Sequence, residues 1–184
     1  MTFAFTLGAT YAAMMSWISA SPFVATQVLG LTTDTFALSF AAASVAMLAS
    51  SSLNAWIGIR VGAKRMLIAG QTLALSAAVL MLISISASAL TQHSFFGLGF
   101  LLIFGFGLTM ANTTALALAA AGHVRGSASA LLSTTQYTCG ALAIPFVGIL
   151  GPGTALPMAV TILVAASIAA SMTAMTLGRI RLSS

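Results

Sequence analysis

The stretch Gly107–Tyr137, GLTMANTTALALAAAGHVRGSASALLSTTQY, decides the fold of this chain. It contains Arg125, which is the only charged residue between Arg65 and Arg179. A long apolar segment lies on each side of this charge, and a helix of about 20 apolar residues is enough to cross a membrane. The stretch therefore predicts two membrane-spanning helices that are joined by a short basic turn.

The composition extends this prediction to the whole chain of 184 residues. Sixty per cent of the residues are hydrophobic, 4% are charged, and the mean hydropathy is +1.12, whereas soluble domains carry about 25% charged residues. The charges separate three apolar segments, residues 1–59, 66–124 and 126–178, and each is about twice as long as one crossing. Three helical hairpins follow, and hence an all-α membrane protein with six transmembrane helices in one bundle. The predicted helices are about 2–28, 35–59, 66–87, 94–121, 127–150 and 156–178.

The basic residues indicate the orientation of these helices. They occur only in alternate turns and in the C-terminal tail, namely Arg60, Lys64, Arg65, Arg125, Arg179 and Arg181. Basic loops stay in the cytoplasm, so the loop residues are predicted cytoplasmic anchors and both termini are predicted to be cytoplasmic. The net charge of +5 then needs no nucleic-acid partner. The two three-helix halves would have opposite orientations, as in a 3+3 inverted repeat. Residues 1–20 lack a basic n-region, so no cleavable signal peptide is expected.

Small residues and prolines mark positions where the helices pack closely or bend. Small residues at every fourth position allow close approach of a neighbouring helix. Three predicted helices carry such stripes: Ala42, Ala46, Ser50, Asn54 and Gly58; Gly70, Ala74 and Ala78; and Gly107, Ala111, Ala115 and Ala119. Pro22 and Pro145 lie inside the first and fifth helices and predict kinks, with Ser19 or Ser21 satisfying the carbonyl that Pro22 frees.

Three polar side chains form the candidate substrate site: Tyr11, Asn112 and Gln136. Each is nine residues from the basic end of its helix, or about 14 Å at about 1.5 Å per residue, and so close to the middle of the membrane core. One interpretation is that they line a midplane cavity, because polar groups at this depth are expensive and mark functional sites. The other is that Asn112 and Gln136 bond neighbouring helices, at about 0.6 to 2 kcal/mol per contact.

The remaining polar residues favour structural roles. Asp34, the only acid, is either a proton or cation carboxylate or, as we favour, a cap or first-turn acid of the second helix. Gln71 is predicted to lie at the membrane interface and His93 in a solvated loop. Cys139 is the only cysteine, which excludes a disulfide within the chain and paired thiolate ligands. The sequence predicts no metal site, no cofactor and no enzyme, since acid–base chemistry has almost no groups to use.

Methionine and aromatic side chains gather on the first helix. Met14, Met15, Trp17 and Phe23 are core or lipid-facing residues by default. Some of them could contribute to an adaptable apolar pocket of the kind that promiscuous binders use.

Three stretches resemble a known family: residues 19–40, SASPFVATQVLGLTTDTFALSF; residues 107–118, GLTMANTTALAL; and residues 126–148, GSASALLSTTQYTCGALAIPFVG. Together with the basic loop GIRVGAKR, they resemble the C-terminal six-helix half of a major facilitator superfamily transporter. Within it they look like the bicyclomycin-resistance (Bcr/CflA) group of drug:proton antiporters. The chain departs from the pattern at Ile59, where the superfamily loop has an acid, and at Ala111, where the group usually has a proline.

The resemblance implies a function for this chain together with a partner. It implies export of drugs or other small amphipathic molecules across a bacterial inner membrane, with the chain in contact with lipid. The partner would be an absent N-terminal six-helix half, which carries most of the proton-coupling groups, or a second copy. The alternative is a truncated, transport-incompetent membrane protein or a non-catalytic membrane subunit.

Overall fold

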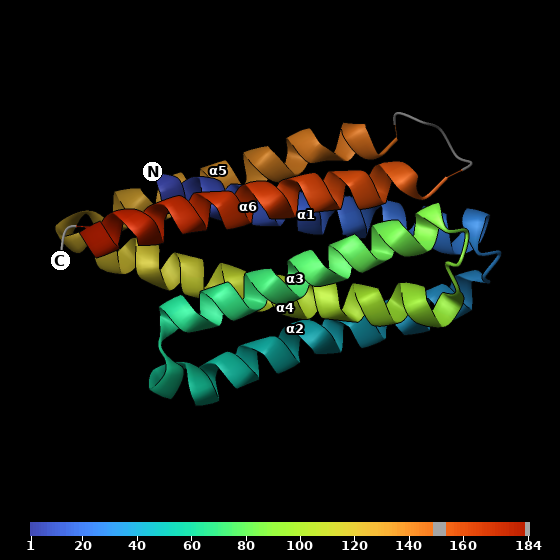
Figure 1. The fold of residues 1–184 in the computed structure, drawn as a ribbon, viewed down its shortest axis with the longest axis horizontal. Coiled ribbons are helices and arrows are strands. Elements are labelled where there is room, and N and C mark those ends of the chain that lie inside the picture. Colours follow the sequence, from blue (N-terminus) through green and yellow to red (C-terminus); the bar gives the residue numbers. More distant parts are fainter. Residues whose placement is uncertain (149–153, 183–184) are drawn as a thin grey trace.

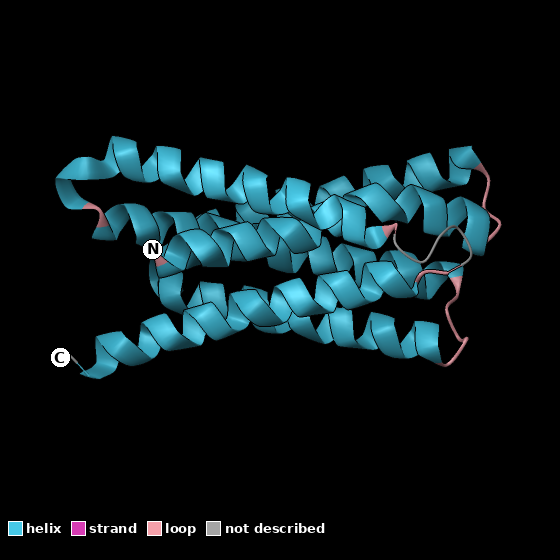
Figure 2. Ribbon diagram, turned by 90° about the horizontal axis from the view of Figure 1, so that it is seen from above, coloured by secondary structure: helices cyan, strands magenta, loops and turns pink. Residues whose placement is uncertain are grey.

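The computed structural model describes residues 1–148 and 154–182, and every regular element in those residues is helical (Figure 1). The helices lie side by side along one axis, as the view from above also shows (Figure 2). They are α1 Thr2–Phe23, α2 Thr33–Val61, α3 Ala63–Ser86, α4 Gln92–Ala120, α5 Arg125–Val147 and α6 Leu156–Leu182. A π-helical turn, Val24–Val28, extends α1, and a 3-10 turn, Gly122–Val124, precedes α5. The predicted end of the fifth helix at residue 150 lies outside the described residues.

The turns are shorter than the sequence indicates, and at α2 and α4 a capping residue starts the helix two residues earlier than predicted. Thr32 caps α2 by accepting a hydrogen bond from the Thr35 amide at 3.3 Å, and Thr91 forms a capping box with Ser94 at the start of α4. The predicted loop 60–65 shrinks to one residue, Gly62, whose φ of 88° suits glycine. Arg60 therefore belongs to the last turn of α2, and Lys64 and Arg65 belong to the first turn of α3.

The basic residues gather at one end of the bundle. The N-terminus, the α2–α3 turn, the α4–α5 turn and the end of α6 lie together in Figure 1, and the other three connections lie at the opposite end. Arg60, Lys64, Arg65 and Arg125 are all exposed at the first of these ends, which we call the basic end. This arrangement is the one that the positive-inside pattern requires, and the cytoplasmic side of the basic end remains a prediction.

Four of the described helices are long and apolar enough to cross a membrane by length and composition: α2, α3, α4 and the part of α6 from Leu156 to Thr176. The helices α1 and α5 are outside this set. Both nevertheless run the length of the bundle beside the others (Figure 1). Six crossings thus remain a proposal, while an all-helical membrane architecture is supported.

The packing of the helices repeats between the two halves of the chain. α1 packs most extensively on α5 and α6, and α4 packs most extensively on α2 and α3. In addition, α3 packs on α6 and α1 packs on α4. Exchanging α1, α2 and α3 for α4, α5 and α6 leaves this pattern unchanged. Because α1 starts at the basic end and α4 at the opposite end, the two three-helix units are also inverted, as a 3+3 repeat requires (Figure 1).

Glycines bring α3 and α4 into backbone contact. A Cβ at Gly105 of α4 would lie 2.7 Å from the carbonyl oxygen of Gly70 on α3, and Ala74 lies beside the same contact. The stripe Gly70, Ala74 and Ala78 is buried as predicted. Gly99 of α4 makes room for the ring of Trp17, which packs at a tilt of 37° against Phe95 with ring centroids 4.7 Å apart.

Of the four small residues predicted to form a packing stripe on the fourth helix, only Gly107 packs against another helix of this chain. Gly107 packs closely against Ser50 of α2, but Ala111, Ala115 and Ala119 are exposed. The glycines of α4 that make close contacts meet three different helices: Gly99 meets α1, Gly105 meets α3 and Gly107 meets α2. The sequence of α4 is apolar on all sides and marks no single packing surface. On α2, Ala46 and Ser50 are buried, whereas Ala42 is exposed.

Candidate functional site

Tyr11 and Gln136 belong to the seam between α1 and α5. The Tyr11 ring packs edge-on against Tyr137 with ring centroids 5.4 Å apart, and a Cβ at Gly140 would lie 2.6 Å from it. Tyr11 and Gln136 are partly exposed, and Tyr137 is exposed. Among the described residues, neither the Tyr11 hydroxyl nor the Gln136 amide has a hydrogen-bond partner, so both can accept or donate to a ligand. Tyr137, which sequence reasoning missed, is marked only by its position next to Gln136.

Asn112 lies on α4 and turns toward α2. Its side chain is 3% exposed, and its Nδ2 donates to Asn54 Oδ1 at 2.7 Å and to the Leu108 carbonyl oxygen at 2.8 Å. Both N–H donors of this amide are thus satisfied within the α2–α4 contact. The depth count places Asn112 level with Gln136 but gives no information on which face of α4 it occupies. The sequence marked Asn54 only as a member of the small-residue stripe on the second helix, and not as a partner of Asn112.

Gln71 is buried between α3 and α6. Its Nε2 donates to Thr173 Oγ1 at 2.8 Å and to the Ala169 carbonyl oxygen at 3.2 Å. Its place at the membrane interface remains a prediction, whereas its contact with α6 was not predicted. Gln71 therefore joins the two three-helix units.

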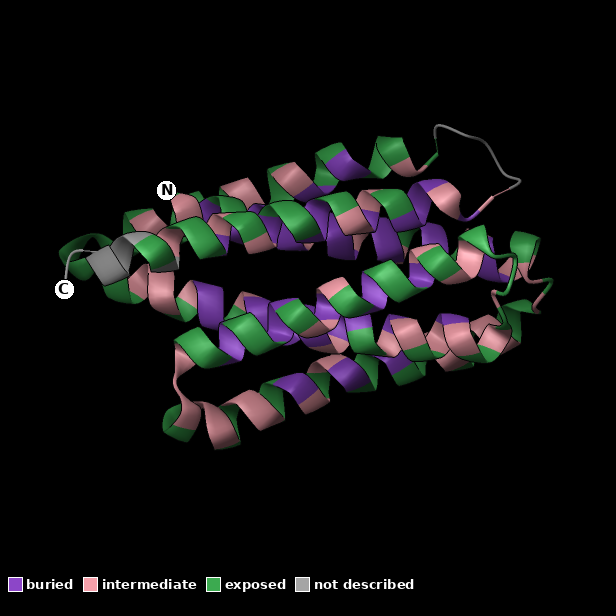
Figure 3. Ribbon diagram, in the orientation of Figure 1, coloured by how far each residue is buried: buried purple, intermediate pink, exposed green. Residues whose placement is uncertain are grey.

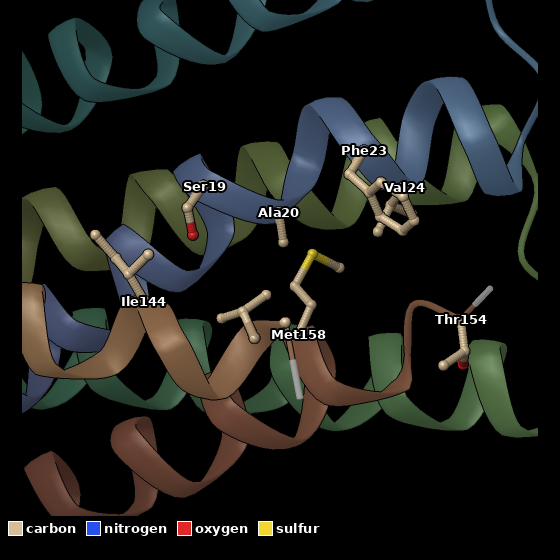
Figure 4. A pocket seen from close by; sticks show the side chains of 9 residues that line it. Ser19, Ala20, Phe23, Val24, Ile144, Thr154 and Met158 are labelled. Atoms are coloured by element: carbon tan, nitrogen blue, oxygen red, sulfur yellow. The ribbon is translucent and has the colours of Figure 1, made fainter. Parts of the chain in front are cut away.

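The region around Pro22 forms a pocket at the end of the bundle opposite the basic end. The pocket has a volume of about 340 Å³ and lies between α1, the end of α5 and the start of α6. Ser19, Ala20, Phe23, Ile144 and Met158 line it, and the Ser19 hydroxyl and the Met158 thioether converge on the same space (Figure 4).

The hydrogen bonds around Pro22 differ from the expectation. The Ser19 hydroxyl donates to the Ser16 carbonyl at 3.4 Å, and the buried Ser21 hydroxyl has no partner among the described residues, so neither satisfies the carbonyl of Ile18. The chain instead changes to a π-helical turn two residues after Pro22. Bends at Pro22 and Pro145 themselves remain predictions.

The carboxylate and the imidazole side chains of the described residues lie outside these sites. Asp34 is exposed in the first turn of α2, in agreement with the structural interpretation, and His93 is exposed in the first turn of α4 and not in a loop. Within residues 1–148 and 154–182, no group of three or more His, Cys, Asp or Glu side chains could hold a metal ion. The Tyr11 hydroxyl and the Gln136 amide are available for hydrogen bonds, and the pocket beside Pro22 offers mainly apolar contacts.

Apolar helices of spanning length, closed by small-residue packing, define a polytopic α-helical membrane protein. Comparison with known proteins indicates which family of membrane proteins the chain resembles. The chain is similar to the uncharacterized MFS-type transporter YdgK of Bacillus subtilis, with 29% identity over 169 residues. The similarity covers 91% of this chain and 41% of that protein. No protein-family model and no solved structure matches the chain.

The likeness to this relative supports membership of the major facilitator superfamily and a transporter function, and not an enzyme. The chain spans about two fifths of the length of the curated relative that it matches.

Proposed function

We propose that this chain is the C-terminal six-helix half of a secondary active transporter that exports drugs or other small amphipathic molecules in exchange for protons. The observation that carries the proposal is the likeness to an MFS-type transporter along 91% of this chain but only 41% of the relative. A half-transporter of this family is a six-helix bundle made of two inverted three-helix units, and the packing of α1–α3 and α4–α6 has that pattern.

In this proposal the substrate site is shared with a partner bundle in a bacterial inner membrane. Tyr11 and Gln136 supply unsatisfied hydrogen-bonding groups from the α1–α5 seam. Asn112 joins them only in a conformation in which its bond to Asn54 opens. The partner is an N-terminal six-helix half or, as the second possibility, another copy of this chain. The basic end faces the cytoplasm, together with both termini.

A second candidate is a transport-incompetent membrane protein. One observation favours it: the only acid, Asp34, is exposed at the end of the bundle opposite the basic end, so this chain offers no buried carboxylate for proton coupling. Efflux from a drug-sensitive host distinguishes the two candidates. We expect no efflux from the chain alone and restored efflux when six further spans are joined upstream of Met1. Efflux from the chain alone would contradict the need for a partner, and no efflux from the joined protein would favour the second candidate.

Thiol accessibility tests the site itself. In a Cys139→Ser background, Gln136→Cys is expected to react several-fold faster with a membrane-impermeant thiol reagent than Ser76→Cys, at an exposed position near the middle of α3. Asn112→Cys is expected to react slowly in the state described here and faster when substrate is transported. Equal, background labelling at 136 and 76 in every state would rule out a water-filled cavity at Gln136.

A further inference from the structure

A pocket of about 490 Å³ lies between α1, α2 and α4. It forms because α1 and α2 each pack on α4 and hardly on each other, which leaves the space between them open. Its wall includes Met14, Trp17, Phe40, Ser44 and Met47. None of Tyr11, Asn112 and Gln136 lines it, so it is separate from the candidate site described above.

The wall of this pocket has a rigid part and an adaptable part. Trp17 is 1% exposed and its ring is held between Phe95 and the backbone at Gly99. Met14 and Met47 are flexible thioethers, which fill irregular gaps and make favourable contacts with aromatic rings. A fixed indole beside two unbranched thioether side chains, which can adopt several rotamers, can accept flat rings of different outline.

The charge of the surroundings selects against cations. Ser44 is the only hydroxyl-bearing side chain in the wall, and it donates to the Phe40 carbonyl oxygen at 3.4 Å, while the Trp17 indole N–H has no partner among the described residues. The only acid of the chain, Asp34, lies in the first turn of α2, six residues before Phe40, and does not line the pocket. Burying a cation without a counter-charge is costly, whereas a neutral aromatic ring gains contact with Trp17, Phe40 and the thioethers.

From this geometry we infer that the pocket between α1, α2 and α4 is a binding site for neutral, planar aromatic molecules. A lipid acyl chain fits it less well. The pocket between α1, α5 and α6, of about 520 Å³, has a chiefly aliphatic wall that suits such a chain better. The inference concerns this bundle alone and does not depend on the proposed transport function.

Tryptophan fluorescence tests the inference on the whole chain in phospholipid nanodiscs. The chain has two tryptophans, and Trp56 is 75% exposed on α2, so Trp56→Phe leaves Trp17 as the only emitter. We expect saturable quenching of Trp17 by N-phenyl-1-naphthylamine, which is neutral, and no saturable quenching by the planar cation ethidium. Saturable ethidium binding of equal affinity would overturn the neutral-ligand inference.

Matched variants on α2 separate binding from partition into lipid. Ser44→Phe fills the pocket from its exposed rim, and Ser52→Phe makes the same change at an exposed position outside the pocket. We expect Ser44→Phe to raise the apparent Kd about tenfold or more, a loss of about 1.4 kcal/mol, and Ser52→Phe to leave it unchanged. Leu48→Phe, also on the exposed rim, is the second blocking variant if Ser44→Phe fails to fold.

Identical, non-saturating quenching in all variants would mean partition into lipid only and would overturn the inference. The binding assay and the efflux assay test separate proposals. Efflux by the joined protein without probe binding would contradict only the inferred binding site, and probe binding without efflux would contradict only the proposed transport function.

Discussion

The four inner helices, α1, α3, α4 and α6, and the two outer helices, α2 and α5, differ in how much of their surface other helices cover (Figure 3). In the most apolar window of α4, half of the residues are buried, against 17% in that of α2. On α5, only Leu132, Gly140 and Ala143 are buried. Each outer helix is attached along one face, α2 to α4 and α5 to α1. The exposed faces of α2 and α5 are therefore the surfaces available to lipid or to another bundle.

The largest effect is expected where two inner helices touch through their backbones. In Gly105→Ala the new methyl group would meet the Gly70 carbonyl and the Ala74 amide, which cannot move as a side chain can. We expect a loss of about 1–3 kcal/mol of stability, measured as a lower Tm in detergent. Gly97→Ala on the same helix is the control, because a Cβ there meets nothing within 4 Å. Equal Tm values for the two variants would show that the inner contact is loose.

A smaller effect is expected where an outer helix meets an inner one. Gly140→Ala on α5 places a methyl group against the Tyr11 ring, which is partly exposed and can turn away. We expect a drop in Tm less than half of that for Gly105→Ala, with Gly126→Ala, at an open position of α5, as the control. A drop as large as that of Gly105→Ala would mean that α5 is held as firmly as the inner helices.

The smallest effects concern the two polar ties between helices. Gln71–Thr173 joins two inner helices and is more deeply buried than Asn54–Asn112, which joins outer α2 to inner α4. Double-mutant cycles with alanine, read from thermal unfolding, are expected to give coupling energies of about 0.6 kcal/mol, at most about 2 kcal/mol. The coupling should be larger for Gln71–Thr173. The reverse order would indicate that the outer helix depends on its tie more than burial suggests.

The residues of the candidate site show how far prediction from sequence extends. The depth of Asn112 followed from its distance to the basic turn, but its partner Asn54 did not, because hydropathy in a helix that is apolar all round marks no face. The same holds for Gln71: its distance from the basic end followed from the sequence, but the helix that covers it, α6, did not. The spacing of Ala111, Ala115 and Ala119 predicted contact with a neighbouring helix, but all three are exposed in this bundle, again because the sequence of α4 marks no packing face.

The sequence by itself determined that the chain is helical, roughly where each helix begins and ends, and that basic residues share one end. These features depend on local quantities: the length of apolar segments, capping residues and the position of charges. Only the tertiary structure decided which faces meet, that α2 and α5 lie outside, and that α1 and α2 diverge to leave a pocket. Those features depend on how closely the backbones of two helices can approach each other. Glycines such as Gly70 and Gly105 permit a close approach only where both lie at the point at which their helices cross.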